Sequence, residues 1–385
     1  MSLAPVIPST DPLLDNLGAA QLPVTLARGQ GARVTDTLGR AYWDFYGGHA
    51  VTLLGQAHPR WVQALTEQAS TLSFCTTMTP TPIRDSAAEA LCAFTGMDVA
   101  FFVNSGAEAN EAALKIARKA TGRPVVIAME RGFHGRTMGA LGVTDRYRSQ
   151  HAPPHGEVRF VPFGDLDALR SAMGSDVAAV MLEPVQGIAG IVEPPPGYLP
   201  AVEAVCRHHG SLLICDEIQS GIGRAGWPLL CMSQGVRPDI ATVGKGLGAG
   251  FPVAATLLTQ AVASSVKPGE HGTTFGGGPL ACAAVGATLA IIRDEQLLAR
   301  STRLGALLKH ALSSIPGVEI VRGSGVWLGV VLDRPARPVQ LSLLDAGFMV
   351  GTSSDPQVLR LCPPAVLPEF AVHAFAAALA SVLEP

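Results

Sequence analysis

Charged residues are scarce in this sequence. Of its 385 residues, 15% are Asp, Glu, Lys or Arg, the net charge is −3, and 48% of residues are hydrophobic. A protein that binds nucleic acid or an anionic membrane through charge has a basic excess, which this sequence lacks. The length predicts two lobes with a large buried interior, and the scarcity of charge indicates that part of the surface is covered in an oligomer.

Long hydrophobic runs and paired cysteines are also missing. The longest apolar runs, such as "VAAVML" and "ACAAVGATLAII", are too short to cross a bilayer. The first residues, "MSLAPVIPSTDP", show no basic segment followed by an apolar core, so we expect no secretory signal and a cytoplasmic protein. The seven cysteines contain no C-x-x-C pair, which predicts reduced thiols rather than disulfides or a metal site. Cys206 and Cys215 are expected to pack as small hydrophobic residues.

Alternating strand and helix patterns begin near residue 100. The run "EANEAALKIARKA" places alanines and Ile116 at helical spacing, with Glu111 and Lys115 on the opposite side. Apolar runs on either side of such helices predict strands buried on both faces, as in a mostly parallel α/β sheet. These runs are "VAFFVN", "PVVIAME", "VAAVMLEPV", "SLLICDE", "DIATVG" and "VAATLLT".

The pattern changes after about residue 280. One long helical stretch over 279–312 is followed by the short strands "VEIVRG", "VWLGVVL" and "VLRLCPP" and by an Ala-rich helix, which predicts a smaller α+β lobe. A hairpin around Leu38 and Gly39 is expected to join that lobe. The predicted division is an N-terminal segment 1–45, a large domain 46–280 and a small domain 281–385.

The stretch "NSGAEANEAALK" is the first candidate for ligand binding. Ser105 and Gly106 lie between a predicted strand and a predicted helix. Free N–H groups and the helix dipole at such a place attract an anion, and glycine lets a phosphate approach the backbone. The alternative is an ordinary helix cap formed by Ser105.

The stretch "SLLICDEIQSGIGRAG" is the second candidate. Asp216 and Glu217 end a hydrophobic strand, where open α/β sheets place ligand chemistry, and a carboxylate there can hold a positive ring nitrogen. The alternative is a carboxylate that caps a loop. Gly221, Gly223 and Gly226 fit the spacing G-x-G-x-x-G, but no helix opens behind them, which argues against a dinucleotide site.

The third candidate is Lys245 in "PDIATVGKGLGAGFPVAA". A lysine in a Gly-rich loop is commonly a solvated residue. This one follows a predicted buried strand, where desolvation lowers the pKa of an amine, and a neutral amine attacks aldehydes. With Asp216 and the phosphate cradle, Lys245 supplies what pyridoxal 5'-phosphate needs.

Six segments in this order resemble the class III, fold-type I aminotransferases, most closely the acetylornithine/ornithine branch. The resemblance runs from about residue 28 to the end. It implies a fold-type I α/β structure with a large domain around a mainly parallel seven-stranded sheet, a smaller α+β domain and a homodimer with shared active sites. The segments are "FFVNSGAEANEAALKIAR", "FHGRT", "EPVQG", "LLICDEIQSGIGRAG", "PDIATVGKGLGAGFPVAA" and "HGTTFGGGPLACAA".

The resemblance also implies roles for single residues. Lys245 would bond to the cofactor and move the substrate proton, and Asp216 would keep the cofactor's ring nitrogen protonated. The other implied cofactor contacts are Ser105, Gly106 and Ala107 at the phosphate, Phe133 and Ile218 on the two faces of the ring, Gln219 at the ring hydroxyl, and Thr274 from the partner subunit.

Substrate contacts follow from the same resemblance. Arg136 and Arg360 would grip carboxylates, for which guanidinium groups are suited, and Thr273 would touch acetylornithine. The alternative for Arg360 is a surface arginine on a strand. In "EPVQGIAG", Ile188 stands where the family commonly has a glutamate that pairs with the second arginine.

The predicted function is a ping-pong amino transfer from N2-acetylornithine to 2-oxoglutarate in arginine biosynthesis. Alternatives within the class are donors such as ornithine, succinylornithine, a carrier-linked lysine and 4-aminobutyrate. Aminomutase or decarboxylase chemistry fits two carboxylate-binding arginines less well. A non-catalytic cofactor-binding protein fits least, because the chemical residues are present.

Overall fold

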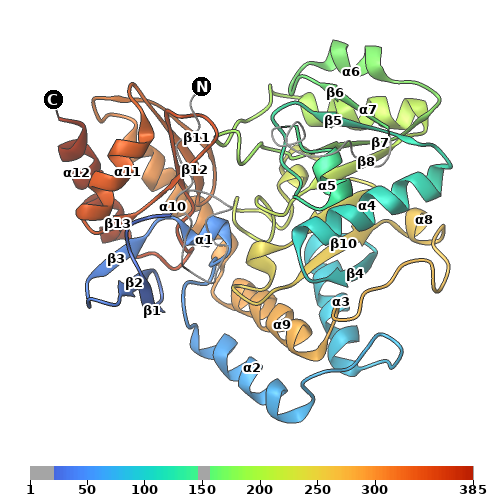
Figure 1. The fold of residues 1–385 in the computed structure, drawn as a ribbon, viewed down its shortest axis with the longest axis horizontal. Helices are drawn as coiled ribbons and strands as arrows, with labels where there is room; N and C mark the ends of the chain where they lie inside the picture. The colour runs from blue at the N-terminus through green and yellow to red at the C-terminus, as the bar shows by residue number, and fades with distance from the viewer. Residues whose placement is uncertain (1–20, 146–156, 385) are drawn as a thin grey trace, which may run out of the picture.

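The computed structural model describes residues 21–145 and 157–384. The stretch "MSLAPVIPSTDP", from which we expect no secretory signal, lies outside these residues. Figure 1 shows a large sheet with its helices on the right and two smaller sheets with the C-terminal helices on the left. Within the described residues, no helix is long and apolar enough to span a membrane.

The large sheet contains all six predicted strands. Its strands are β4 (Val99–Val103), β5 (Val125–Met129), β6 (Val158–Val161), β7 (Val177–Leu182), β8 (Leu212–Asp216), β9 (Ile240–Val243) and β10 (Ala254–Leu258). Their order in the described chain is β4-β10-β9-β8-β7-β5-β6, and β10 runs antiparallel to both of its neighbours. The mainly parallel seven-stranded sheet is therefore confirmed. We missed β6, an edge strand whose half-exposed residues form no long apolar run.

Helices cover this sheet because each has one apolar face. The predicted helix is α4 (Gly106–Thr121), whose buried side includes Ala109, Ala113 and Ile116. Ser105 caps its first turn, and Gly122 ends it in the left-handed conformation. The other helical segments between β4 and β10 or near them are α3 (Pro82–Thr95), α5 (Met138–Gly142), α6 (Leu166–Ala172), α7 (Tyr198–His209), η3 (Leu230–Gln234), η4 (Lys245–Leu247) and α8 (Gln260–Ala263).

Both ends of the described chain contribute to the smaller sheets. The strands are β1 (Leu26–Gln30), β2 (Arg33–Asp36), β3 (Ala41–Asp44), β11 (Val318–Ser324), β12 (Trp327–Leu332), β13 (Phe348–Met349), β14 (Gly351–Thr352) and β15 (Val358–Leu361). The predicted hairpin is β2–β3, with Gly39 at φ 84° in its turn. Strand β3 pairs with β13, so the N-terminal segment lies against the C-terminal third of the chain. The domain boundaries at residues 45 and 280 stay predictions.

The helical stretch predicted over 279–312 is helical but not continuous. The structure has two helices there, α9 (Pro279–Asp294) and α10 (Leu297–Leu312), because Gln296 adopts φ 51° and ends the helical path. No glycine or proline marks this break in the sequence. The remaining helices are α1 (Gly47–Ala50), α2 (Pro59–Thr71), α11 (Ala336–Asp345) and α12 (Glu369–Leu383).

Candidate active site

Three predicted segments meet at one edge of the large sheet. Strands β4, β8 and β9 run in the same direction, so their carboxyl ends share this edge. A Cβ atom added to Gly106 would lie 2.7 Å from Cδ1 of Ile218, and one added to Gly244 would lie 3.6 Å from Cγ2 of Ile218. The first distance is too short for a real Cβ atom, so glycine at position 106 allows the close approach of Ile218. The helix start, the Asp216 loop and the Lys245 loop are therefore in van der Waals contact.

Lys245 is held in an unusual conformation at this edge. Its φ of 44° is left-handed, which costs energy for a residue with a Cβ atom and is typical of functional sites. Burial lowers the pKa of its amine to about 8, against the attraction of Asp216 and with help from the charge of Arg360. The solvated-loop alternative does not fit, because Lys245 is half-buried and its amine is desolvated.

The lowered pKa of Lys245 can be measured without the cofactor. Trace acetylation of the apoprotein labels each amine in proportion to its neutral fraction. Because the pKa of Lys245 lies near 8 rather than the usual 10.5, its labelling should fall by half at about pH 8 as the pH decreases. Peptide mass spectrometry at each pH reads the titration. A midpoint near 10.5 would contradict desolvation of this amine.

Asp216 is fixed by hydrogen bonds from three directions. Its Oδ2 accepts from Nδ2 of Asn110 at 2.9 Å and from Nδ1 of His134 at 2.7 Å, and its Oδ1 accepts from the N–H of Ile218 at 3.1 Å. Burial opposes a charge on His134, but Asp216 outweighs burial and raises the pKa of the imidazole. Sequence reasoning missed Asn110 and His134, although His134 lies in "FHGRT" and Asn110 interrupts an alanine face.

Glu183 orients the loop that carries Phe133. This buried carboxylate accepts from the N–H of Phe133 at 3.0 Å and from the N–H of Gly187 at 2.9 Å. Burial raises its pKa to about 7. Gly135, at φ 130°, packs against Ala107, because a Cβ there would lie 2.7 Å from that of Ala107. The segment "EPVQG" therefore helps to bring the Phe133 loop to the start of α4, a role that we did not predict.

The start of α4 is a capped helix end that also offers free N–H groups. Oγ of Ser105 accepts from the N–H of Glu108 at 3.3 Å, so the ordinary cap is present. The first N–H groups of a helix have no acceptor within the helix, which leaves those of Gly106 and Ala107 for a ligand. The cap and the phosphate cradle are compatible interpretations.

Arg360 is buried, with 2% of its surface exposed, so the surface-arginine alternative is wrong. Its Nε donates to the carbonyl of Thr352 at 2.8 Å, and its Nη1 donates to Oε1 of Gln219 at 3.3 Å. Its Nη2 lies 3.3 Å from Nδ1 of His49. Burial, and then the charges of Arg360, Lys245 and Arg136, lower the pKa of His49 to about 4. The charges of Arg136, Arg360 and Lys245 are therefore all close enough to His49 to affect its pKa.

Thr273 and Thr274 lie on a loop near the start of α4. Oγ1 of Thr273 accepts from Nδ2 of Asn104, the residue before Ser105, at 3.4 Å. Thr274 is exposed. Within residues 21–145 and 157–384 of this single chain, no hydrogen bond joins Thr274 to Gly106 or Ala107. Its predicted place in the site stays a prediction.

The amine, the carboxylate and the backbone N–H groups at this edge of the sheet fit pyridoxal 5'-phosphate. Lys245 offers an amine of lowered pKa for an aldehyde, and Asp216 offers a buried carboxylate for a protonated ring nitrogen. The capped start of α4 offers N–H groups for a phosphate. Phe133, Ile218 and Gln219 come from the same loops, so the predicted contacts to the ring remain compatible with the geometry.

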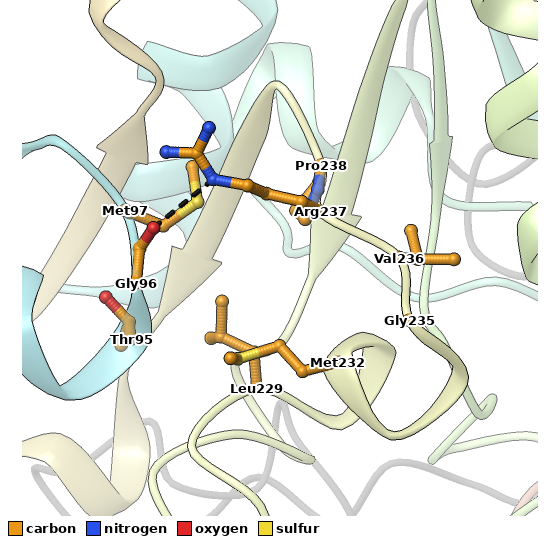
Figure 2. Close-up of a pocket in the computed structure, with 9 residues that line it drawn as sticks. All are labelled: Thr95, Gly96, Met97, Leu229, Met232, Gly235, Val236, Arg237 and Pro238. Atoms are coloured by element: carbon orange, nitrogen blue, oxygen red, sulfur yellow. Dashed lines mark hydrogen bonds between the residues drawn. The ribbon is translucent and has the colours of Figure 1, made fainter.

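A cavity lies at the opposite edge of the sheet, away from Lys245. It has a volume of about 210 Å³ and a mainly apolar lining that includes Met97, Leu229 and Val236 (Figure 2). Arg237 lies beside it and donates from Nε to the carbonyl of Gly96 at 3.3 Å. The side chain of Arg237 also pairs with Asp98. None of the residues predicted for catalysis lines this cavity.

Comparison with known proteins gives consistent matches along the chain. The family model Aminotransferase class-III matches residues 16–383. Acetylornithine aminotransferase of Mycobacterium bovis is 42% identical over 97% of this chain and 94% of its own length. That of Streptomyces coelicolor is 44% identical over 97% and 93%. A structure of Toxoplasma gondii ornithine aminotransferase with partial occupancy of PLP at its active site has a TM-score of 0.90 and 32% identity over 96% of this chain and 92% of that one.

Proposed function

Because the chain belongs to the class-III aminotransferases, which use pyridoxal 5'-phosphate, we propose that it transfers the δ-amino group of N2-acetylornithine to 2-oxoglutarate. The donor becomes an aldehyde, N-acetylglutamate 5-semialdehyde, and 2-oxoglutarate becomes glutamate. The two half-reactions balance without an external oxidant. The identity of 42% and 44% to two acetylornithine aminotransferases carries the choice of donor.

Lys245 and Asp216 have different roles in the proposed reaction. The bound cofactor supplies an electron sink for the carbon that loses a proton. The amine of Lys245 accepts that proton and returns it, a task suited to a pKa near 8. Asp216, held by Asn110 and His134, keeps a negative charge beside the ring nitrogen. Buried groups fixed in advance stabilise charge more strongly than water does.

Two carboxylates of the acceptor match two arginines. 2-Oxoglutarate carries one carboxylate at each end, and guanidinium groups bind carboxylates through paired hydrogen bonds. Arg136 is exposed near the site, and Arg360 is buried beside it. Their effect on the same imidazole, His49, supports a common substrate cavity. Thr273 remains the proposed contact to the acetylornithine chain.

A donor screen tests this function. The holoenzyme is supplied with 2-oxoglutarate and one amino donor, and glutamate formation is measured. We expect N2-acetylornithine to have the highest kcat/KM, above ornithine, succinylornithine, 4-aminobutyrate and a carrier-linked lysine. A higher value for any of these would assign the physiological donor differently, and no glutamate from any donor would contradict an aminotransferase of this kind.

We also propose a homodimer in which Thr274 completes the phosphate site of the partner subunit. An exposed apolar patch, formed by Leu72, Phe74, Met78 and Phe275, supports this interface. Phe74 and Phe275 lie 5.5 Å apart between ring centroids. Large exposed apolar patches mark protein interfaces. Residues of α2, which ends beside this patch at the bottom of Figure 1, are also not buried in the single chain.

Arg84 links the apolar patch to the Thr274 loop. Its Nε donates to the carbonyl of Gly277 at 2.8 Å, and its Nη groups donate to the carbonyls of Cys75, Thr76 and Thr79. These bonds fix the two exposed segments relative to each other. A partner that covers the patch would therefore meet Thr274 as well.

Mixed dimers give a prediction for this arrangement. Lys245→Ala subunits and Thr274→Ala subunits are each expected to have low activity. In a mixed dimer, one of the two sites combines an intact Lys245 with an intact Thr274, so activity should return to as much as about half of the wild-type value per dimer if the sites are independent. Activity is measured after separate purification, mixing and isolation of the mixed dimers. Mixed dimers as inactive as the parents would contradict a shared site.

The cysteines support the proposed cytoplasmic location. All seven lie in the described residues and are unpaired, and Cys206 and Cys215 are buried as expected. Burial raises the pKa of the Cys206 thiol, so this thiol stays protonated and unreactive. Free thiols of this kind persist in a reducing compartment.

A further inference from the structure

We propose that His49 sets the balance between the two amino donors by holding Arg360 through a neutral acceptor. The inference rests on the proposed function, because the donors compared are glutamate and N2-acetylornithine. His49 lies in α1, far from Arg360 in sequence, and acts on the substrate through the guanidinium. It is therefore a positioning residue.

The contact between His49 and Arg360 fixes the state of the imidazole. Nδ1 of His49 lies 3.3 Å from Nη2 of Arg360. A guanidinium has donors and no acceptor, so Nδ1 must accept and the ring proton must be on Nε2. The ring of Tyr46 packs against the imidazole at 4.7 Å between centroids. His49 also has φ 62°, a left-handed conformation in which His, Asn and Asp are enriched.

Among the described residues, the three hydrogen-bond partners of Arg360 are all uncharged. Besides His49, they are the carbonyl of Thr352 and the amide oxygen of Gln219. Within the described residues, no carboxylate lies in ion-pair contact with this buried guanidinium. The pKa of His49, lowered to about 4 by burial and by nearby cations, keeps the imidazole neutral. Arg360 therefore retains its positive charge beside the site.

Position 188 lies close to this arrangement and adds no charge to it. The carbonyl of Ile188 accepts from the N–H of Ser354 at 2.8 Å, two residues beyond Thr352. The preceding Gly187 packs against Gln219, because a Cβ there would lie 2.8 Å from the amide carbon. The resemblance implies a glutamate at this position, which would neutralise Arg360. In this chain, His49 and Gln219 hold the guanidinium without neutralising it.

Arg360, whose charge is not paired with a carboxylate of the protein, interacts differently with the two amino donors. Glutamate has a carboxylate on the carbon that bears the reacting amino group, whereas the reacting carbon of N2-acetylornithine has none. The guanidinium therefore gains a charged partner from glutamate and stays unpaired with acetylornithine. An unpaired buried charge is costly. Because His49 binds Arg360 without neutralising it, the site favours glutamate and 2-oxoglutarate over N2-acetylornithine.

Two substitutions at position 49 separate charge from shape. In His49→Asn, Oδ1 takes the place of Nδ1 as a neutral acceptor, and asparagine tolerates the left-handed backbone. His49→Asp has the same shape with a negative charge. We expect Asp to lower kcat/KM for glutamate relative to acetylornithine by about tenfold, and Asn to leave this ratio within about twofold. Each value comes from the isolated half-reaction of the holoenzyme.

Binding of glutarate, a dicarboxylate without an amino group, gives a second readout. Calorimetry on the holoenzyme should show a Kd about tenfold higher in His49→Asp and unchanged in His49→Asn. Ile188→Glu, with Ile188→Gln as its neutral control, should change the donor ratio in the same direction as His49→Asp. This pair tests the charge at Arg360 without altering the backbone at position 49.

The outcomes distinguish the inference from the function on which it rests. Equal effects of Asp and Asn on the ratio and on glutarate binding, in an enzyme that uses both donors, would overturn the role of His49 alone. A wild-type enzyme that reacts with glutamate but not with acetylornithine would overturn the proposed donor. The glutarate affinities of the two variants would still decide the role of His49.

Discussion

Replacement of Lys245 by alanine is expected to reduce kcat/KM by a factor on the order of 10⁴ or more, the largest effect of any single substitution in this chain. In the proposed mechanism, the substitution removes the amine that bonds to the cofactor and the group that moves the substrate proton. No other lysine can take its place, since the sequence has five lysines and Lys245 is the one at this edge of the sheet. Single-turnover measurements with excess enzyme separate this loss from slow product release.

A matched control and a labelling experiment accompany this prediction. Lys309→Ala removes an amine near the end of α10, away from the large sheet, and should leave activity unchanged. Borohydride reduction of the wild-type holoenzyme should attach the pyridoxyl group to the peptide that contains Lys245. A label on a different lysine, or substantial turnover by Lys245→Ala, would show that the assignment is wrong.

Asp216→Asn should have the second largest effect, a fall in kcat on the order of 10³-fold. An amide has no negative charge to hold a protonated ring nitrogen. The amide also fits its neighbours less well than the carboxylate. The side-chain amide of Asn110 and Nδ1 of His134 both donate to Oδ2 of Asp216, and an NH₂ group at this position could not accept from them. The loss should appear in kcat, with a smaller change in KM, because the charge acts mainly after the substrate is bound.

Asp239→Asn is a suitable control for Asp216→Asn. Asp239 also belongs to a loop of the large sheet, and its Oδ2 accepts from the N–H of Leu213 at 2.8 Å at the edge opposite Lys245. Its substitution is expected to affect stability and to leave kcat within about twofold of the wild type. Similar losses of kcat in both variants would indicate a general effect of charge or folding rather than a role for Asp216 at the cofactor.

The sequence predicts the parts of this site that are local. Asp216 ends a hydrophobic strand, and Lys245 and Gly106 come just after one; strands that run in the same direction bring their carboxyl ends to one edge. The sequence therefore predicts that these residues lie along one edge, and the strand order in the structure brings them together. The six apolar runs of the large sheet could be predicted for the same reason, because strands buried on both faces need continuous hydrophobic sequence.

The partners of these residues could not be predicted in the same way. Asn110 and Asp216 are 106 positions apart, and His49 and Arg360 are 311 apart, so their contacts depend on packing of the whole chain. Gln296 ends α9 in a left-handed conformation for which its residue type gives no signal. Ile188 was visible as a departure from the family pattern, but only the structure shows the neutral acceptors around Arg360.

Transfer of a labelled nitrogen atom tests the central claim most directly. The holoenzyme is incubated with N2-acetylornithine carrying ¹⁵N at the δ-amino group and with unlabelled 2-oxoglutarate, and the products are examined by mass spectrometry. We predict glutamate with one ¹⁵N atom and an equal amount of N-acetylglutamate 5-semialdehyde, with neither product formed by Lys245→Ala. Unlabelled glutamate, or release of the label as ammonia, would contradict an amino transfer at Lys245.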